Sequence, residues 1–217
     1  MRKKLAFLIA LVSIFLIATA GCTNEQADKE NSNELNLEGY LNKDDQIIEA
    51  IKKQPIGATG PKLIYAYKQY AVILNFNGIL IYDFDKENII HTIDNMSLGL
   101  NKMQGSDYTI AKSNNEKIAL GNISAIENSA YVYNIEKNEL SNAKGTEEFK
   151  EVKHVDKEEL PNTILNDNND NAGNAVYNEK GNIVLLTYRY EDGTDSWILY
   201  ILEKDSLDII KQVNVFK

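Results

Sequence analysis

Asp83 and Asp85 are two carboxylates at a spacing that could support glycoside hydrolysis. They flank Phe84 in a stretch of strand character, and residues two apart on a strand point to the same face. A glycosidase needs two carboxyl groups, about 5–5.5 Å apart in retaining enzymes and about 6.5–9.5 Å apart in inverting ones. However, Glu136 and Glu203 occupy the position of Asp85 in a phrase that the chain repeats. This recurrence favours a structural role in turns and leaves hydrolysis as an alternative.

Oxygen ligands crowd into the segment NDNNDNAGN at Asn166–Asn174. In the register of a twelve-residue EF-hand calcium loop, Asp170 falls at position 3, Gly173 at position 6 and Glu179 at position 12. Positions 1 and 5 carry no acid, and the flanking residues predict strands instead of helices. The segment is therefore interpreted as an Asx-rich flexible loop, with a calcium site at Asp170 and Glu179 as the alternative.

Aromatic side chains gather near the C-terminus at Tyr188, Tyr190, Trp197 and Tyr200. Tyr and Trp are enriched where proteins bind peptides or other ligands, but they also form cross-strand pairs that hold a sheet together. Packing explains most of the four. Tyr190 and Trp197 are the residues we expect to reach a ligand, with Tyr190 beside an exposed hairpin loop.

Catalytic constellations are scarce. The chain has two histidines, His91 and His154, so a metal site built on several imidazoles is excluded and a Ser-His-Asp triad would need one of these two. The glycine pair at Gly57–Gly60 lacks the Lys-Ser/Thr ending of a phosphate-binding loop. The sequence therefore predicts a protein that is not an enzyme and carries no cofactor.

Cys22, the single cysteine, follows a segment that has the parts of a secretory signal: a basic start at Arg2–Lys4, an apolar run at Leu5–Ala20 and small residues before the cysteine. Thr19–Cys22 resembles the lipobox of bacterial lipoproteins, although the family prefers an aliphatic residue where Thr19 stands. The resemblance implies cleavage after residue 21 and lipidation of Cys22 with diacylglycerol and palmitate-type chains. Two acyl chains anchor a protein stably, at about 0.8 kcal/mol per buried CH₂. An ordinary signal peptide with a chance cysteine is the alternative.

The expected mature chain is strongly acidic. Loss of residues 1–21 removes three positive charges and lowers the net charge from −9 to −12, which excludes nucleic acid as a partner and disfavours contact with anionic lipid headgroups. Residues 22–36 comprise the lipidated cysteine and a polar segment that cannot bury enough apolar surface to fold. We expect this segment to be a disordered tether with a reach on the order of 20 Å.

Residues 37–61 are expected to form a helix and a connector. Asn42 is a good N-cap, acids occupy the first turn, and lysines occupy the last turn. Ile47, Ile48 and Ile51 make a narrow apolar stripe, and Pro55 ends the segment. The pattern predicts a helix over about 43–53 that packs on the main domain.

From residue 62 to 217 the periodicity is that of β-strands. A phrase beginning with tyrosine occurs three times: YDFDKENI at Tyr82, YNIEKNEL at Tyr133 and YILEKDSL at Tyr200. It predicts three repeats, about 62–104, 105–150 and 165–217, each with four antiparallel strands. The expected strands are Leu63–Tyr67, Tyr70–Asn75, Ile79–Phe84, Ile89–Ile93; Tyr108–Lys112, Lys117–Leu120, Ala130–Ile135, Glu139–Ala143; and Ala175–Tyr177, Ile183–Tyr190, Trp197–Leu202, Leu207–Val213.

Four-stranded antiparallel units in tandem resemble the blades of a β-propeller. The expected fold is therefore mainly β, with three blade-like repeats and one N-terminal helix. Because propellers usually have four to eight blades, an irregular stack of β-meanders or a sandwich is the alternative.

The helix and the first repeat also resemble a more particular group. GYLNKDDQII from Gly39, IYAYKQYAVILNFNGILIYDF from Ile64 and IDNMSLGLNKMQG from Ile93 are similar to extracellular tails of Gram-positive membrane zinc peptidases of the beta-lactam-sensor type. The resemblance covers about residues 39–140 and no catalytic residue, and the zinc-binding helix of that family has no counterpart here. It implies a ligand-sensing or partner-binding accessory domain.

Together these patterns predict a non-catalytic module that binds or senses a ligand or protein at the extracellular face of a bacterial cell membrane. The expected partners are the membrane, through the lipid anchor, and an envelope protein or a cell-wall ligand. Two alternatives remain open. One is a cell-wall glycan hydrolase that uses paired carboxylates, and the other is a structural partner in an envelope complex.

Overall fold

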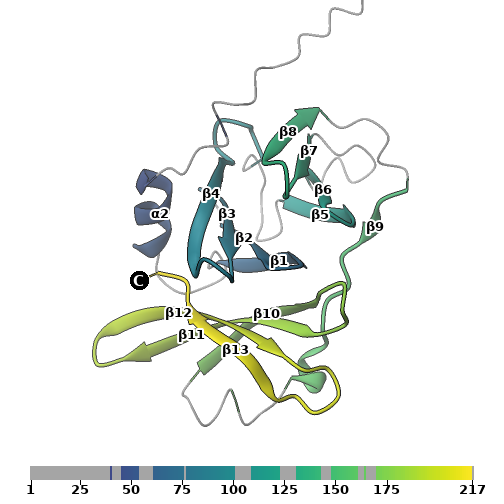
Figure 1. Ribbon diagram of the computed structural model, residues 1–217. Helices are drawn as coiled ribbons and strands as arrows, with labels where there is room; N and C mark the ends of the chain where they lie inside the picture. Colours follow the sequence, from purple (N-terminus) through teal and green to yellow (C-terminus); the bar gives the residue numbers. More distant parts are fainter. Residues whose placement is uncertain are drawn as a thin grey trace, which may run out of the picture. The chain divides into compact units, whose positions relative to one another are not determined.

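The computed structural model describes residue 40 and residues 45–53, 61–75, 77–100, 109–122, 131–142, 148–160, 164 and 170–216. The predicted signal peptide, Cys22 and the tether lie outside these residues. The described chain is mainly β, with one α-helix and three antiparallel sheets (Figure 1). This confirms the expectation of a mainly β fold with one helix. The strands of the described residues form no closed barrel or propeller.

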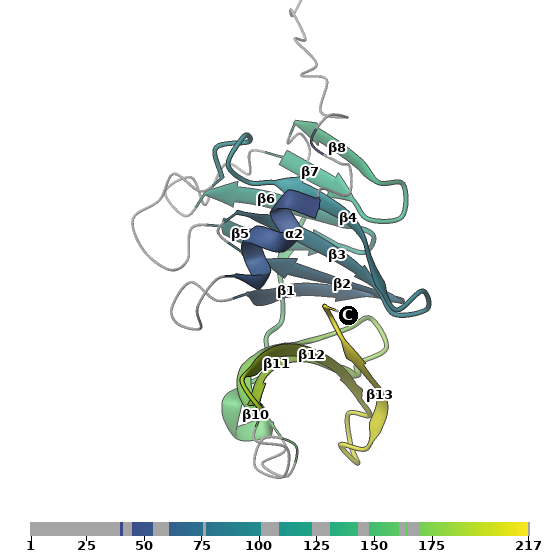
Figure 2. The same cartoon turned by 90° about the vertical axis from the view of Figure 1, so that its left-hand side faces the viewer.

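The helix α2 (Asp45–Lys52) lies across one face of the first sheet (Figure 2). Ile48 and Ile51 are buried beneath it, as the apolar stripe predicts. The sheet meets the helix at Gly78, where a Cβ atom would come within 2.7 Å of Ile47 Cγ2 and 2.8 Å of a backbone oxygen. A glycine is therefore needed for this approach. The expected N-cap, Asn42, lies outside the described residues.

Sheet A is formed by the first repeat, in the order β1-β2-β3-β4. Each strand end lies within one residue of its expected place. The strands are β1 (Lys62–Tyr67), β2 (Tyr70–Leu74), β3 (Gly78–Asp83) and β4 (Asn88–Asp94).

Sheet B is formed by the second repeat and one strand that the sequence did not predict. That strand, β9, follows the repeat and pairs with β5 at the sheet edge, giving the order β8-β7-β6-β5-β9. Its two exposed, charged residues carry no apolar alternation, so no strand signal marks them. The strands are β5 (Thr109–Asn114), β6 (Lys117–Asn122), β7 (Tyr131–Asn134), β8 (Glu139–Asn142) and β9 (Lys150–Glu151).

Sheet C, from the third repeat, has apolar side chains on both faces. Along β11, Val184 and Leu186 join one buried cluster, while Ile183 and Leu185 join a second. The second cluster is completed by residues from the segment that follows sheet B, which includes the short 3₁₀ helix η3 (Lys157–Glu159). The strands are β10 (Asp170–Tyr177), β11 (Ile183–Glu191), β12 (Thr194–Leu202) and β13 (Ile209–Asn214).

The repeated tyrosines occupy the same place in each sheet. Tyr82, Tyr133 and Tyr200 lie on β3, β7 and β12, the third strand of each repeat, and all three are fully buried. A turn into the fourth strand follows each of these third strands. The phrase in the sequence therefore marks a repeated structural unit.

A side-chain oxygen caps each of these turns. Asp83, Asn134 and Glu203 each accept a hydrogen bond from the backbone N–H three residues later, at 3.2, 3.0 and 2.6 Å. In the first two repeats the capping residue directly follows the tyrosine, so it is not the shared acid at Asp85 or Glu136. The shared acid caps the turn in the third repeat alone, where an isoleucine follows the tyrosine.

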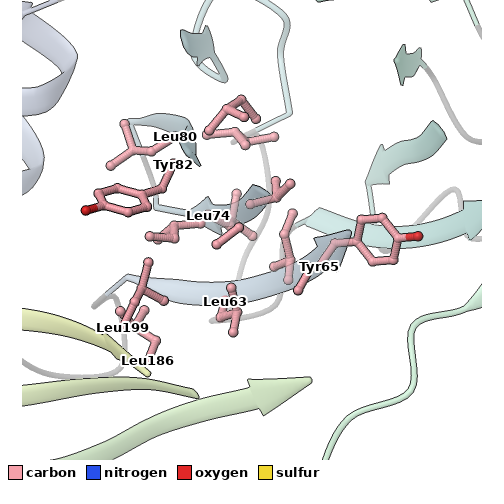
Figure 3. Packing of buried hydrophobic residues seen from close by; sticks show 14 of the residues in the cluster. Leu63, Tyr65, Leu74, Leu80, Tyr82, Leu186 and Leu199 are labelled. Carbon is pink, nitrogen blue, oxygen red and sulfur yellow. The ribbon is translucent and has the colours of Figure 1, made fainter. Parts of the chain in front are cut away.

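Sheets A and C share a core. Figure 3 shows Leu63 of β1 facing Leu186 and Leu199 of sheet C, and all three belong to one buried cluster. Asn174 of β10 also joins the two sheets, because its amide donates to the carbonyl oxygen of Leu63 and accepts from the N–H of Leu63 at 2.7 Å. The side chain of Asn174 thus replaces a neighbouring strand at this point of β1.

Candidate functional site

A cavity of about 310 Å³ lies between α2, the β3–β4 turn and the segment after β13. We call it the α2 cavity. Its volume is at the lower end of the range of ligand pockets, about 300–1,000 Å³. The lining residues are Asp45, Ile48, Glu49, Lys52, Glu87, Asn88, Ile89, Val215 and Phe216.

The helix contributes the charged side of the α2 cavity. Asp45, Glu49 and Lys52 are spaced by four and three residues, so they share one edge of the helix, next to the face that buries Ile48 and Ile51. Lys52 Nζ forms an ion pair with Glu49 Oε1 at 3.1 Å. The same helix therefore packs on the sheet with one face and lines the cavity with Ile48 of that face and the charged edge beside it.

The β3–β4 turn adds a third acid. Glu87 has a left-handed backbone (φ 48°), which reverses the chain between the two strands. Its Oε1 atom lies 3.5 Å from Lys211 Nζ of β13. Lys211 Nζ also donates to the carbonyl oxygen of Phe84 at 2.5 Å, so this lysine holds the turn against sheet C.

The segment after β13 supplies the aromatic wall. Val215 N–H donates to the carbonyl oxygen of Trp197 at 2.8 Å and extends the pairing of β13 with β12. Phe216 N–H donates to Asn214 Oδ1 at 3.1 Å, and this hydrogen bond holds the backbone of Phe216 in place. Lys52 Nζ lies 5.7 Å from the centroid of the Phe216 ring, within the range of a cation–π interaction.

Acids outnumber lysines among the charged residues that line the α2 cavity. Three carboxylates, from Asp45, Glu49 and Glu87, and the ammonium of Lys52 form its charged lining. Lys52 pairs with Glu49, and Lys211 pairs with Glu87. The apolar part of the lining comes from Ile48, Ile89, Val215 and Phe216. Such an arrangement can bind a positively charged group on an apolar body, because the carboxylates attract the charge and the aromatic ring face stabilises it.

Tyr82 lies beside this cavity in the sheet, since it pairs with the lining residue Ile89. Its hydroxyl is buried and has no hydrogen-bond partner among the described residues. Burial, together with the nearby carboxylates of Glu87 and Asp83, raises the pKa of Tyr82 to about 12. The neutral phenol is therefore the form that the fold accommodates.

The predicted calcium ligands are not brought together. Asp170 is the first residue of β10, and Glu179 lies two residues beyond its end. A strand advances about 3.3 Å per residue, which separates the ends of β10 by roughly 20 Å. Glu179 Oε2 instead accepts a hydrogen bond from the N–H of Lys68 at 2.8 Å. The described residues contain no group of three or more His, Cys, Asp or Glu that could hold a metal ion.

The aromatic candidates divide between surface and core. Tyr190 is 61% exposed, whereas Trp197 is 6% exposed and packs edge-on against Tyr188, with ring centroids 5.0 Å apart. Tyr200 lies in the second cluster, on the other face of sheet C, and its hydroxyl accepts from Arg189 Nη2 at 3.3 Å. Tyr190 thus remains available to a ligand, and Trp197 serves packing.

The paired carboxylates are separated by the end of a strand. β3 ends at Asp83, so the alternation of faces does not extend to Asp85, which is exposed. Asp83 is 2% exposed, caps its turn and lies 3.4 Å from Lys86 Nζ. Neither acid lines the α2 cavity.

The two histidines lie apart from this cavity. His91 is partly buried on β4, and burial, with the charge of Lys86, lowers its pKa. His154 is exposed and forms an isolated bridge with Val176. Neither side chain lines the α2 cavity.

Sequence reasoning missed the α2 cavity because its residues come from three distant segments. One local signal was present: Asp45, Glu49 and Lys52 form a polar edge beside the isoleucine stripe. No pattern in the sequence connects that edge with Glu87 or Phe216, which reach it through tertiary packing.

The chain was compared with protein-family models, curated proteins and solved structures, and nothing matched. In the described part of the chain, no helix has the length and apolar character needed to cross a membrane.

Proposed function

We propose that this chain is a lipid-anchored, non-catalytic binding module at the extracellular face of a bacterial membrane, and that its α2 cavity binds a cationic group carried on an apolar body. The lipobox pattern at Thr19–Cys22 and the polar segment that follows support the anchoring. The cavity supports the binding, because three acids line it together with the apolar side chains of Ile48, Ile89, Val215 and Phe216.

The contact of Lys52 with Phe216 carries the proposal. The ammonium of Lys52 lies over the ring of Phe216 and is paired with Glu49. The protein's own lysine therefore displays the contacts that a ligand ammonium would make at this site: a carboxylate on one side and an aromatic face on the other.

We also propose that the three sheets are blades of a short propeller-like domain. The buried tyrosine and its turn recur at one position in each sheet. In addition, β1 lies beside both β5 and β10, so the first strands of the three repeats come together, as the inner strands of propeller blades do.

Calorimetric titration of the full chain in detergent tests the binding. The probes are the acetylated, amidated tripeptides Leu-Lys-Leu and Leu-Glu-Leu, which differ in the charge of one side chain. We expect the lysine peptide alone to bind, and Asp45→Asn with Glu49→Gln to weaken it about tenfold or more. Equal binding of both peptides would refute charge recognition in the α2 cavity.

Anchoring is tested with Cys22→Ala in a bacterial host fed a clickable palmitate analogue. The unaltered chain should be labelled and should sediment with membranes. The variant should lose both properties, because a thioether cannot form at alanine. A variant that stayed labelled would place the lipid elsewhere and refute the role of Cys22.

A structural partner in an envelope complex is the second candidate function, and the edge strand β13 favours it. Ile209 and Ile210 on this strand are 48% and 55% exposed, and an edge strand presents backbone groups that another chain can pair with. Crosslinking from cysteine introduced at Gln212 should capture one stoichiometric protein in membranes. Its absence would leave ligand binding as the function.

A further inference from the structure

Sheet B contains a second cavity, of about 230 Å³, which shares no residue with the α2 cavity. We call it the sheet B cavity. The lining residues are Lys117, Val132, Asn134, Lys137, Glu139, Ser141 and Phe149.

Strand register places the polar residues of the sheet B cavity in rows. Lys117 of β6, Asn134 of β7 and Glu139 of β8 lie directly opposite one another across the three strands. Val132 and Ser141 form the neighbouring row, two residues along the strands. Because residues two apart share a face, one face of the sheet carries the whole set.

The other face of the same strands is part of the core. Ile118, Tyr133 and Leu140 alternate with the cavity residues and are buried. The cavity therefore lies on a surface whose backbone is held by packing from behind, which gives its side chains fixed points of attachment.

Two lysines, one glutamate and the amide of Asn134 supply the polar groups of the lining, together with Ser141. Lys117 and Lys137 form no ion pair with any described residue. Asn134 uses Oδ1 to accept the N–H of Lys137 at 3.0 Å, which leaves the Nδ2 group as the donor of this amide. The row thus runs from an ammonium, through an amide donor, to the carboxylate of Glu139.

The remaining lining residues provide a hydrogen-bond acceptor and an apolar wall. Ser141 Oγ donates to the carbonyl oxygen of Val132 at 3.4 Å, so the lone pairs of the hydroxyl can accept a further bond. Phe149, from the segment before β9, contributes an aromatic side chain to the lining. Val132 and Phe149 provide the apolar part of the wall.

We propose that the sheet B cavity binds a small zwitterion of the amino-acid type. The ligand carboxylate is held by Lys117, Lys137 and the Asn134 amide, its ammonium by Glu139, and its apolar part by Val132 and Phe149. A simple anion would be repelled by the carboxylate of Glu139, and a simple cation would be repelled by the two lysines. A molecule with both charges matches the complete row.

Three probes of one shape test this inference: phenylalanine, 3-phenylpropanoate and phenethylamine. They present both charges, the negative charge alone and the positive charge alone. In calorimetric titrations of the full chain in detergent, we expect phenylalanine to bind at least tenfold more tightly than either of the others. Equal affinity for phenylalanine and 3-phenylpropanoate would overturn the zwitterion assignment, as would the absence of heat with all three at millimolar concentration.

Variants locate the site. Lys117→Met should weaken phenylalanine binding at least tenfold, whereas Lys150→Met, on the edge strand β9 of the same sheet but outside the cavity, should leave it unchanged. Glu139→Gln should remove the preference for phenylalanine over 3-phenylpropanoate. All three positions are exposed, so the fold should tolerate the changes, and circular dichroism checks this. Binding that responds to Glu49→Gln but not to Lys117→Met would assign the ligand to the α2 cavity and refute the proposal.

Discussion

The α2 cavity and the sheet B cavity differ in how the chain assembles them. The first is built from a helix near residue 45, a turn near residue 87 and the end of the chain near residue 216. The second comes from residues 117–149, almost entirely from three adjacent strands. A site of the first kind depends on how separate elements dock, while a site of the second kind is a property of one sheet.

This difference predicts unequal robustness. α2 has eight residues, and isolated helices shorter than about 12–15 residues are marginal in water. Its position must therefore come from the burial of Ile48 and Ile51, each worth about 1.5–3 kcal/mol. Any change that undocks the helix should remove the α2 cavity and leave the sheet B cavity intact.

Gly78→Ala should have the largest effect. The new Cβ would come within 2.7 Å of Ile47 Cγ2 and 2.8 Å of the Ile93 carbonyl oxygen, and overpacking of this kind typically costs about 1–3 kcal/mol. We expect urea denaturation to show this loss. We also expect binding of the lysine tripeptide to fall while phenylalanine binding persists.

Gly193→Ala is the matched control. A Cβ at this turn meets no atom within 4 Å, although φ is 79°, so the change introduces backbone strain of about 1–2 kcal/mol without touching α2. Both cavities should keep their ligands. If Gly78→Ala left the lysine tripeptide bound as before, the α2 cavity would not depend on helix docking.

The next largest effect should come at alkaline pH, through the buried Tyr82 of sheet A. The pKa of Tyr82 is raised to about 12 by burial, above the value of about 10 for a free tyrosine. A raised pKa favours folding while the group is protonated, so its contribution is complete below about pH 10 and is lost as the pH rises toward 12. Denaturation midpoints should therefore fall over this range, and by less in Tyr82→Phe. An identical pH profile in that variant would show that Tyr82 does not control the transition.

At neutral pH the two equivalent tyrosines should respond with opposite sign. The Tyr82 hydroxyl has no partner among the described residues, whereas the Tyr133 hydroxyl donates to Asn138 Oδ1 at 2.9 Å. Tyr82→Phe should therefore stabilise the fold by about 1 kcal/mol, because a buried unsatisfied group is removed, and Tyr133→Phe should destabilise it by about 1 kcal/mol. Urea denaturation measures both. Destabilisation by Tyr82→Phe would mean that its hydroxyl has a partner in solution.

The sequence predicted the strands because alternation and the tyrosine phrase act locally. Tyr82, Tyr133 and Tyr200 occupy the expected positions because each phrase encodes a strand and the turn that follows it. The strand β10 was expected to begin at Ala175 but begins at Asp170. Its polar residues carry no strand signal, and pairing with the long strand β11 extends it.

The candidate sites were less predictable, because they depend on contacts between segments and not on local patterns. The sheet B cavity depends on strand register, which places Lys117 opposite Asn134 and Asn134 opposite Glu139. The boundaries of the three strands nearly determine this pairing. The α2 cavity depends on where Phe216 lies relative to Lys52. Local sequence patterns do not contain that relation.

Lys68→Met should have the smallest effect. This residue lies where sheet A contacts sheet B. Lys68, in the β1–β2 turn, forms an ion pair with Glu136, which precedes the cavity residue Lys137. The hydrogen bond that Lys68 Nζ donates to Glu136 raises the pKa of Lys68, so the protonated lysine favours folding at neutral pH and loses this effect at strongly alkaline pH. Both side chains are exposed, and such pairs contribute little and are screened by salt.

Thermal denaturation of Lys68→Met at low and at high salt measures this contribution. The backbone N–H of Lys68, which donates to Glu179, is retained in the variant, so the comparison isolates the side chain. We expect a small decrease in the midpoint at low salt that disappears at high salt, with phenylalanine binding unchanged. If phenylalanine binding weakened, the sheet B cavity would depend on its neighbouring sheet, and the distinction between an assembled site and a site within one sheet would fail.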